Sequence, residues 1–390
     1  MKTHRPKSVR AALTLAALLA FTAVEARAAE PPKPEPAKPK PRIEVAFVLD
    51  TTGSMGGLIE GAKTKIWSIA NDMIRAKPTP EIKIGLVAYR DRGDAYVTQV
   101  VDLSSDIDAV YGRLRELHAD GGGDTPESVN QALADAVNKL SWSQDRNVLK
   151  TVFLVGDAPP HMDYPQDVLY PVTLQAAVKK DLLINTIQCG NDPDTARIWQ
   201  EIARLGEGKY VALGQTGDMV ASTTPLDAEI AKVARDLGST AIGYGDADRR
   251  AALSRKVEVA AEAPAPVAAD KAAFGARGGA EGAVVTGEGD LVADIAAGKT
   301  SLDKVAPQNL PEPVRALAPE ERADYVAKQL EKRKELQSKM NELVTKRDAY
   351  LADERERLAK TGAKDSFDEK VTEAIRAEAK TKGIEYSTSK

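Results

Sequence analysis

The sequence has a single cysteine in 390 residues, Cys189, so no disulfide can form within the chain. Cys189 lies in the apolar run LLINTIQC, and no histidine is close to it in the sequence. A buried structural thiol is therefore favoured over a nucleophile. The folded part of the chain must depend on its hydrophobic core rather than on cross-links.

Aromatic residues are scarce as well, at 5% of the chain, whereas charged residues make up 29%. Together with the length, this composition predicts one core domain with extensions that lie outside it. The formal net charge is only −4, and no basic block after the first 28 residues would follow a phosphate backbone. Nucleic acid is therefore not expected as a partner.

The first apolar run, from Ala11 to Val24, is shorter than the roughly 20 residues that a membrane-spanning helix needs. Basic residues precede it, and Ala26-Arg27-Ala28 has the small-x-small pattern of a cleavage site. We expect residues 1–28 to be a signal peptide. The mature chain would then be periplasmic or secreted, with no stable membrane span. An uncleaved membrane anchor is the alternative.

The rest of the chain divides by composition. Residues 29–41 alternate proline with charge, which predicts an extended linker. Strand-like and helix-like patterns then alternate over residues 42–245, which predicts an α/β fold with a doubly wound, mainly parallel sheet. The strand-like runs are 43–49, 82–89, 96–101, 148–155, 182–188 and 209–212, and the helical patterns are 58–75, 107–118, 126–140, 166–180, 194–205 and 226–237.

The C-terminal part has two sections. Residues 246–300 are rich in alanine and glycine with little periodicity, which predicts a flexible linker. Residues 301–390 are predicted to be helical, with one long charged helix that has a broken apolar stripe. Arg333 and Arg347 interrupt this stripe, so two interpretations stay open: a coiled coil that self-associates, or a helix that docks elsewhere.

Side chains with oxygen donors gather at strand ends. Asp50 closes the first strand in VLDTTGSMGG, and Asp157 closes another in TVFLVGDAPPH. Both should lie in the crevice at the carboxyl ends of the strands of a doubly wound sheet. The glycine-rich DGGGDTPES brings Thr125 to the same edge. The sequence thus predicts one cluster made of Asp50, Thr52, Ser54, Thr125 and Asp157.

This cluster offers only hard oxygen ligands, which suit a small divalent cation, Mg²⁺ in the first place and Mn²⁺ or Ca²⁺ as alternatives. Two carboxylates balance the charge of the ion, and the hydroxyls are neutral. The ion therefore keeps an affinity for one more anionic oxygen, such as a carboxylate of a partner. Asp124, His161 and Asp163 are further candidates to line the site, although an exposed His161 on a rigid proline loop is favoured.

The arrangement resembles the metal-ion-dependent adhesion site of von Willebrand factor type A domains: Asp-x-Ser-x-Ser, a distant Thr and a distant Asp. Thr52 stands where serine is usual and keeps the hydroxyl. The resemblance covers Arg42 to about Gly245, and DTTGSM, GLVAYRD, GGGDTPES and GDAPPH are similar to one bacterial branch of exported type A proteins. It implies that hydroxyls ligate the metal directly, that the carboxylates often act through water, and that the chain binds a protein partner.

Two other functions stay open. A metal-dependent hydrolase would use the same ion to activate water, with His161 or Asp124 as base. A scaffold would instead act through its helical tail. Phosphate-loop chemistry is not supported, because Ala62 in GGLIEGAK stands where the lysine must be. We therefore expect a binding protein rather than an enzyme.

Overall fold

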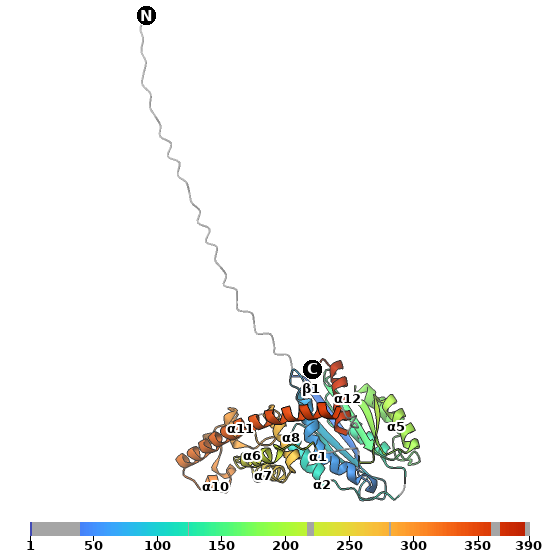
Figure 1. Ribbon diagram of the computed structural model, residues 1–390, viewed down its shortest axis with the longest axis horizontal. Coiled ribbons are helices and arrows are strands. Elements are labelled where there is room, and N and C mark those ends of the chain that lie inside the picture. Colours follow the sequence, from blue (N-terminus) through green and yellow to red (C-terminus); the bar gives the residue numbers. More distant parts are fainter. Residues whose placement is uncertain (2–39, 124, 217–221, 281, 360–366, 387–390) are drawn as a thin grey trace. The chain divides into compact units, whose positions relative to one another are not determined.

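The computed structural model describes residue 1 and residues 40–123, 125–216, 222–280, 282–359 and 367–386 (Figure 1). The signal peptide, nearly all of the linker 29–41 and Asp124 lie outside these ranges and stay predictions. From Lys40 onward, contacts join the chain into one unit. In the described part, no helix is both long and apolar enough to cross a membrane.

A six-stranded sheet lies at the centre of this unit, with the strand order β3-β2-β1-β4-β5-β6. β1 is parallel to both β2 and β4, whereas β3 is antiparallel to β2. The order therefore reverses between β1 and β4, and their carboxyl ends form the crevice where such sheets bind ligands. The strands are β1 (Arg42–Asp50), β2 (Glu81–Tyr89), β3 (Thr98–Ser104), β4 (Leu149–Gly156), β5 (Leu183–Cys189) and β6 (Glu207–Leu213).

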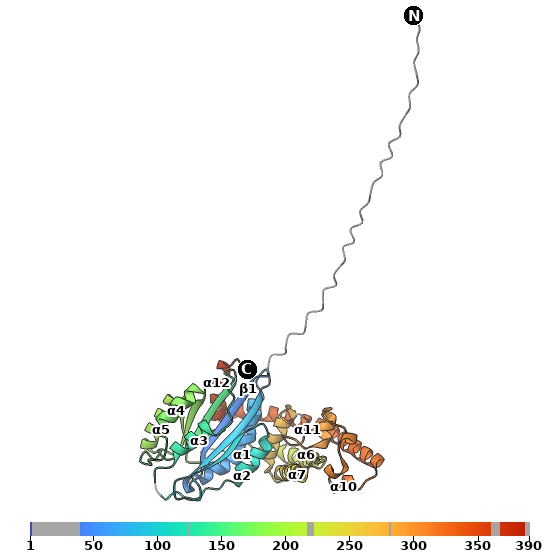
Figure 2. The same ribbon diagram turned by 180° about the vertical axis from the view of Figure 1, so that it is seen from behind.

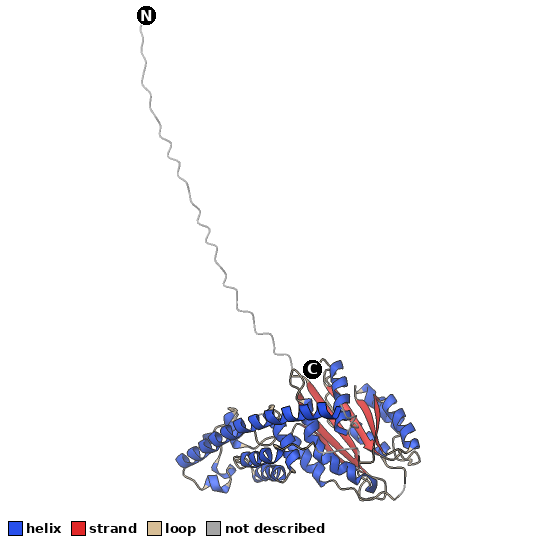
Figure 3. Cartoon of the chain, viewed as in Figure 1, coloured by secondary structure: helices blue, strands red, loops and turns tan. Residues whose placement is uncertain are grey.

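Helices cover both faces of the sheet, as Figures 2 and 3 show. Alternate residues of β1 point to opposite faces, so Phe47 joins one core and Val48 the other. Trp67 of α1 packs in the first core and Trp199 of α5 in the second. The first helices are α1 (Gly56–Met73), α2 (Ile107–Glu116), α3 (Val129–Asn138), α4 (Tyr170–Lys179), α5 (Pro193–Leu205) and α6 (Asp227–Gly238). The predicted fold class is confirmed.

The prediction that residues 246–300 form a flexible linker is wrong. The described residues of this range form the helices α7 (Ala247–Ala261), α8 (Ala265–Ala276) and α9 (Leu291–Ala296). Phe274 of α8 is buried, and its ring centroid lies 5.6 Å from that of Trp67 in α1. Alanine has the highest helix propensity, and small side chains let helices pack closely, so an alanine-rich stretch here forms packed helices.

The long predicted helix is present as α11 (Pro319–Ala359), preceded by the short α10 (Glu312–Arg315). Its apolar stripe packs within the chain, where Met340 and Leu343 share a core with residues of α6 and α8. The two arginines that interrupt the stripe are buried, and each forms hydrogen-bonded ion pairs: Arg333 with Asp290, and Arg347 with Asp227 and Asp270. The seam that a coiled coil would use is thus occupied inside this chain.

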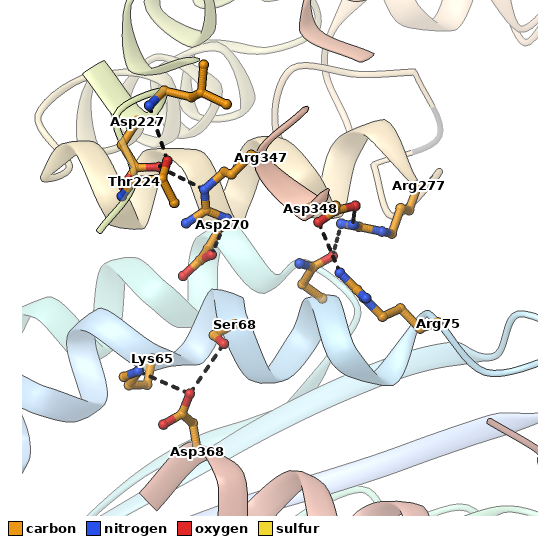
Figure 4. Close-up of polar contacts among 12 residues, drawn as sticks. Lys65, Ser68, Arg75, Thr224, Asp227, Asp270, Arg277, Arg347, Asp348 and Asp368 are labelled. Atoms are coloured by element: carbon orange, nitrogen blue, oxygen red, sulfur yellow. Dashed lines mark hydrogen bonds and ion pairs between the residues drawn. The ribbon is translucent and has the colours of Figure 1, made fainter. Parts of the chain in front are cut away.

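The last helix, α12 (Phe367–Thr381), returns to the sheet and lies beside β1 and α1. Phe367 belongs to the same core as Phe47 of β1, with ring centroids 6.3 Å apart. Lys65 of α1 pairs with Asp368 at 3.1 Å (Figure 4). The predicted division into a domain 42–245 and a helical region 301–390 is therefore incomplete, because α12 belongs to the hydrophobic core of the sheet.

Candidate metal centre

The end of β1 forms the first wall of the site. The chain leaves the sheet at Asp50 and makes a 3-10 turn, Gly53–Met55, before α1 begins. Asp50 is fully buried, and its Oδ1 accepts hydrogen bonds from the backbone N of Thr52 at 2.9 Å and from its Oγ1 at 2.6 Å. Thr52 Oγ1 also lies 3.4 Å from Ser54 Oγ. These contacts bring two of the three hydroxyls of the predicted set, those of Thr52 and Ser54, together.

A glycine loop forms the second wall. Gly121 and Gly122 have φ angles of +73° and +76°, in the left-handed region that glycine adopts without strain. Gly53 N donates to Gly121 O at 3.2 Å, and a Cβ on Gly122 would lie 3.1 Å from Thr52 Cβ. Glycine thus allows the loop that carries Thr125 to approach the end of β1.

Asp157 forms the third wall, just after β4. Its Oδ2 accepts a hydrogen bond of 2.6 Å from Gln215 Nε2. The preceding residue, Gly156, has no side chain, and a Cβ there would lie 3.0 Å from Asp50 Cβ. This close approach holds the ends of β1 and β4 together.

Four of the five predicted ligands line one pocket: Thr52, Ser54, Thr125 and Asp157. The fifth, Asp50, accepts a hydrogen bond from the hydroxyl of Thr52, which lines the pocket. The structure therefore brings the predicted cluster together, whereas its occupation by a metal stays a prediction. Asp124 lies outside the described residues. The pocket is lined by Thr52, Gly53, Ser54, Gly121, Gly122, Gly123, Thr125, Glu127, Asp157, Ala158 and Asp192.

His161 and Asp163 are not among the residues that line this pocket. The expectation of an exposed His161 is wrong, because the residue is only 7% exposed and its ring stacks on Tyr164 with centroids 4.0 Å apart. Its Nδ1 lies 2.8 Å from Asp163 Oδ1, and its Nε2 lies 3.5 Å from Asp91 Oδ2. The backbone explains this inward position, since His161 N donates to Glu127 O at 2.9 Å.

Carboxyl groups crowd this site and disfavour one another's ionised form. Burial raises the pKa of Asp50 from 3.8 to about 7; hydrogen bonds from Thr52 oppose this rise, and the charge of Asp157 adds to it. Burial raises the pKa of Glu127 further, from 4.5 to about 9, and nearby carboxylates add to it, with Asp50 first. Asp50 Oδ2 and Glu127 Oε2 are both buried without a hydrogen-bond partner. A cation in the pocket would relieve both deficits.

The donor set fits a small divalent cation. It combines carboxylates with the hydroxyls of Thr52, Ser54 and Thr125 around one pocket. Within the described ranges, no group of three or more His, Cys, Asp or Glu side chains could hold a metal by itself. A metal site here would therefore combine carboxylates with hydroxyls, and hard oxygen donors of this kind suit Mg²⁺.

Sequence reasoning missed Glu127 as a pocket residue. The glycine-rich GGGDTPES indicates Thr125 as the ligand from this loop, and the pattern over residues 126–140 predicts one helix. The helix α3 begins only at Val129, so Glu127 still belongs to the loop that faces the pocket. The signal was an acidic residue two positions after the predicted threonine ligand.

Residues 44–217 match the family model of the von Willebrand factor A domain. Human von Willebrand factor A domain-containing protein 7 is 28% identical over 213 residues, which cover 53% of this chain and 22% of that protein. The mouse protein of the same name is 32% identical over 146 residues, or 37% of this chain and 15% of that protein. The chain thus spans less than a quarter of the length of these relatives.

Solved structures also resemble this chain. The SpRpn10 VWA domain gives a TM-score of 0.34 at 16% identity and covers 46% of this chain and 91% of that one. Proximal thread matrix protein 1 from the mussel byssus gives a TM-score of 0.35 at 16% identity and covers 45% of this chain and 43% of that one. The family model and the sheet itself agree on the extent of the domain, which runs from β1 through β6. This chain therefore contains a von Willebrand factor A domain.

Proposed function

We propose that this chain is an exported binding protein that captures a protein partner through a divalent cation, with a carboxylate of the partner completing the coordination. A von Willebrand factor A domain indicates protein–protein interaction or adhesion, and such domains are usually not enzymes. The observation that carries the proposal is the pocket at the reversal point of the sheet, which Thr52, Ser54, Thr125 and Asp157 line together.

The hydroxyls of Thr52, Ser54 and Thr125 would hold the cation, with Asp50 and Asp157 supplying negative charge. When bound, the metal supplies a positive charge that attracts an anionic oxygen of the partner. Asp50 orients the first ligand, because the Thr52 hydroxyl donates its hydrogen to Asp50 Oδ1 at 2.6 Å and keeps its lone pairs for the ion. Gln215 similarly orients Asp157 through Oδ2.

Mn²⁺ gives a direct test of an open coordination position, because it is paramagnetic and speeds the relaxation of water protons that exchange on it. We expect the intact chain to bind Mn²⁺ and to show enhanced relaxation, and added acetate to lower the enhancement by displacing that water. Asp157→Ala should abolish Mn²⁺ binding. The matched control is Asp163→Ala, because Asp163 is exposed and does not line the pocket. Acetate without effect on the bound Mn²⁺ would contradict capture of a carboxylate.

The structure does not support the alternative of a hydrolase, because neither residue proposed as its base is seen at the pocket among the described residues. His161 is buried against Tyr164 and does not line the pocket, and Asp124 lies outside the described residues. A panel of phosphate and ester substrates with Mg²⁺ tests this alternative. Turnover that disappears in Asp157→Ala would favour the hydrolase over the binding protein.

A further inference from the structure

Glu127 lies in the pocket between the glycine loop and α3. Its side chain is 3% exposed, and it lines the same pocket as Thr52 and Asp157. A Cβ on Gly122 would lie 3.5 Å from Glu127 Oε1 and 3.1 Å from Thr52 Cβ. Glu127 and Thr52 thus both contact the space that the missing side chain of Gly122 leaves free.

The backbone of Glu127 is fixed firmly. Its N donates to Pro159 O at 2.9 Å, and its O accepts hydrogen bonds from His161 N at 2.9 Å and Val129 N at 2.8 Å. Pro159 follows Asp157 by two residues, so these bonds tie Glu127 to the loop that carries Asp157. The position of the Glu127 carboxylate is therefore set by the same framework as the predicted ligands.

Among the described residues, no lysine or arginine forms an ion pair with this carboxylate. Its side chain is 3% exposed, and Asp157 lines the same pocket. Arg90 and Arg92, which flank Asp91, pair elsewhere, with Asp120 and Asp167 respectively. Asp91 is satisfied by the hydroxyls of Ser128 and Tyr164, whereas Glu127 Oε2 has no partner. A buried carboxylate oxygen without a partner is costly and calls for a physical reason.

We propose that Glu127 is a third acidic residue of the divalent-cation site, one that strengthens binding of the ion and that the Asp-x-Thr-x-Ser, Thr and Asp pattern does not include. This inference rests on the proposed function, because it needs a cation in the pocket. Glu127 acts by accepting a hydrogen bond from water on the ion rather than as a third carboxylate ligand, because no group of three acidic side chains among the described residues could hold a metal.

A third carboxylate also changes how the loaded site binds an anion. Three carboxylates carry −3 when ionised, and a divalent ion leaves the site at −1, whereas two carboxylates leave it neutral. Glu127 therefore increases the affinity for the ion and decreases the affinity of the loaded site for an anionic oxygen. The site would hold its metal tightly and bind a carboxylate partner reversibly.

The test is calorimetric titration of the intact chain with MgCl₂, in parallel for wild type, Glu127→Gln and Glu378→Gln. Glutamine keeps the shape of the side chain and removes the charge. We expect Glu127→Gln to weaken Mg²⁺ binding by about tenfold or more, in the range found for residues that support metal ligands. Glu378 is a matched control, because it is also buried with one unpartnered oxygen but does not line the pocket. Glu378→Gln should leave Mg²⁺ affinity unchanged.

Thermal unfolding in excess chelator separates a metal-binding role from a structural one. Without metal, the buried carboxylate is a cost, so Glu127→Gln should raise the midpoint of unfolding, by on the order of 1–3 °C in a unit of this length. Equal Mg²⁺ affinity in Glu127→Gln and wild type, or a lowered midpoint without metal, would overturn the inference alone. Absence of Mg²⁺, Mn²⁺ and Ca²⁺ binding in wild type would overturn the proposed function with it.

Discussion

Arg347 of α11 donates a hydrogen bond of 2.8 Å to Asp227 of α6, across 120 positions of the sequence. The same guanidinium donates to Asp270 of α8 at 2.8 Å, so one buried side chain joins three helices (Figure 4). Nearby, Arg75 at the end of α1 lies 3.1 Å from Asp348, which also pairs with Arg277. Buried ion pairs of this kind fix which helices pack together, and they leave uncompensated charges when one partner is removed.

Arg347→Ala should therefore destabilise the chain by about 3–5 kcal/mol, because Asp227 and Asp270 would stay buried without their counter-ion. Urea unfolding followed by circular dichroism measures this loss. Arg357→Ala is the control, because Arg357 is exposed on the same helix and pairs only with Glu354 one turn away in the described contacts. A loss of less than about 1 kcal/mol in Arg347→Ala, the size typical of surface pairs, would show that the three helices do not depend on this contact.

Phe367→Ala tests whether α12 belongs to the core of the sheet. Phe367 is buried next to Phe47 of β1, so we expect its removal to cost about 3–5 kcal/mol of unfolding free energy. Tyr350→Ala should change stability by no more than about 0.5 kcal/mol, because Tyr350 is 41% exposed. If Phe367→Ala and wild type had the same free energy of unfolding, α12 would be a separate tail.

The sequence predicted the sheet well, because its central strands are apolar on both faces and its helices have clear periodicity. Val45 and Phe47 in β1 and Leu154 in β4, for example, are buried as the pattern indicates. The cluster of Asp50, Thr52, Ser54, Thr125 and Asp157 was also predictable, because strand ends in this topology meet at one edge.

The misjudged regions depend on long-range contacts that local patterns do not reveal. Alanine-rich α8 has no strong apolar stripe, yet it packs on Trp67 of α1 through Phe274. Arg333 and Arg347 looked like interruptions of a seam, whereas their partners Asp290 and Asp227 lie far away in the sequence. Glu127 was overlooked because only the folded loop shows that its side chain is buried in the pocket.

Gly122→Ala tests whether the glycine loop shapes the site. The left-handed φ of +76° should cost an alanine about 1–2 kcal/mol, and its Cβ would also press on Thr52 at 3.1 Å. Gly278→Ala is a matched control, because Gly278 has a φ of +90° with nothing within 4 Å of an added Cβ. Both variants should lose stability, but only Gly122→Ala should weaken Mg²⁺ binding. Equal Mg²⁺ affinities in the two variants would argue against a role of the loop in the site.

Glu378 should make stability depend on pH. Burial raises the pKa of its carboxyl above the usual 4.5, and the hydrogen bond from Asn185 only partly opposes this. The folded state then binds the proton of Glu378 more tightly than the unfolded state does. The stability that this proton binding contributes is fully present below the unfolded pKa of 4.5 and is lost as the pH rises through the folded pKa.

Glu378→Gln removes this loss. We expect the variant to gain stability over wild type as the pH rises from 4.5 toward 8, measured as unfolding free energies from urea titrations at each pH. A difference between Glu378→Gln and wild type that stays constant over this pH range would mean that Glu378 ionises equally in the folded and unfolded chain.

The central claim is that the pocket at the ends of β1 and β4 holds one divalent cation. Calorimetric titration of the intact, chelator-treated chain with MgCl₂ tests it most directly. The account predicts saturable heat with one ion per chain, which disappears in Asp157→Ala and persists in Asp163→Ala. The absence of saturable heat with MgCl₂, MnCl₂ and CaCl₂ alike in the folded wild-type chain would contradict it.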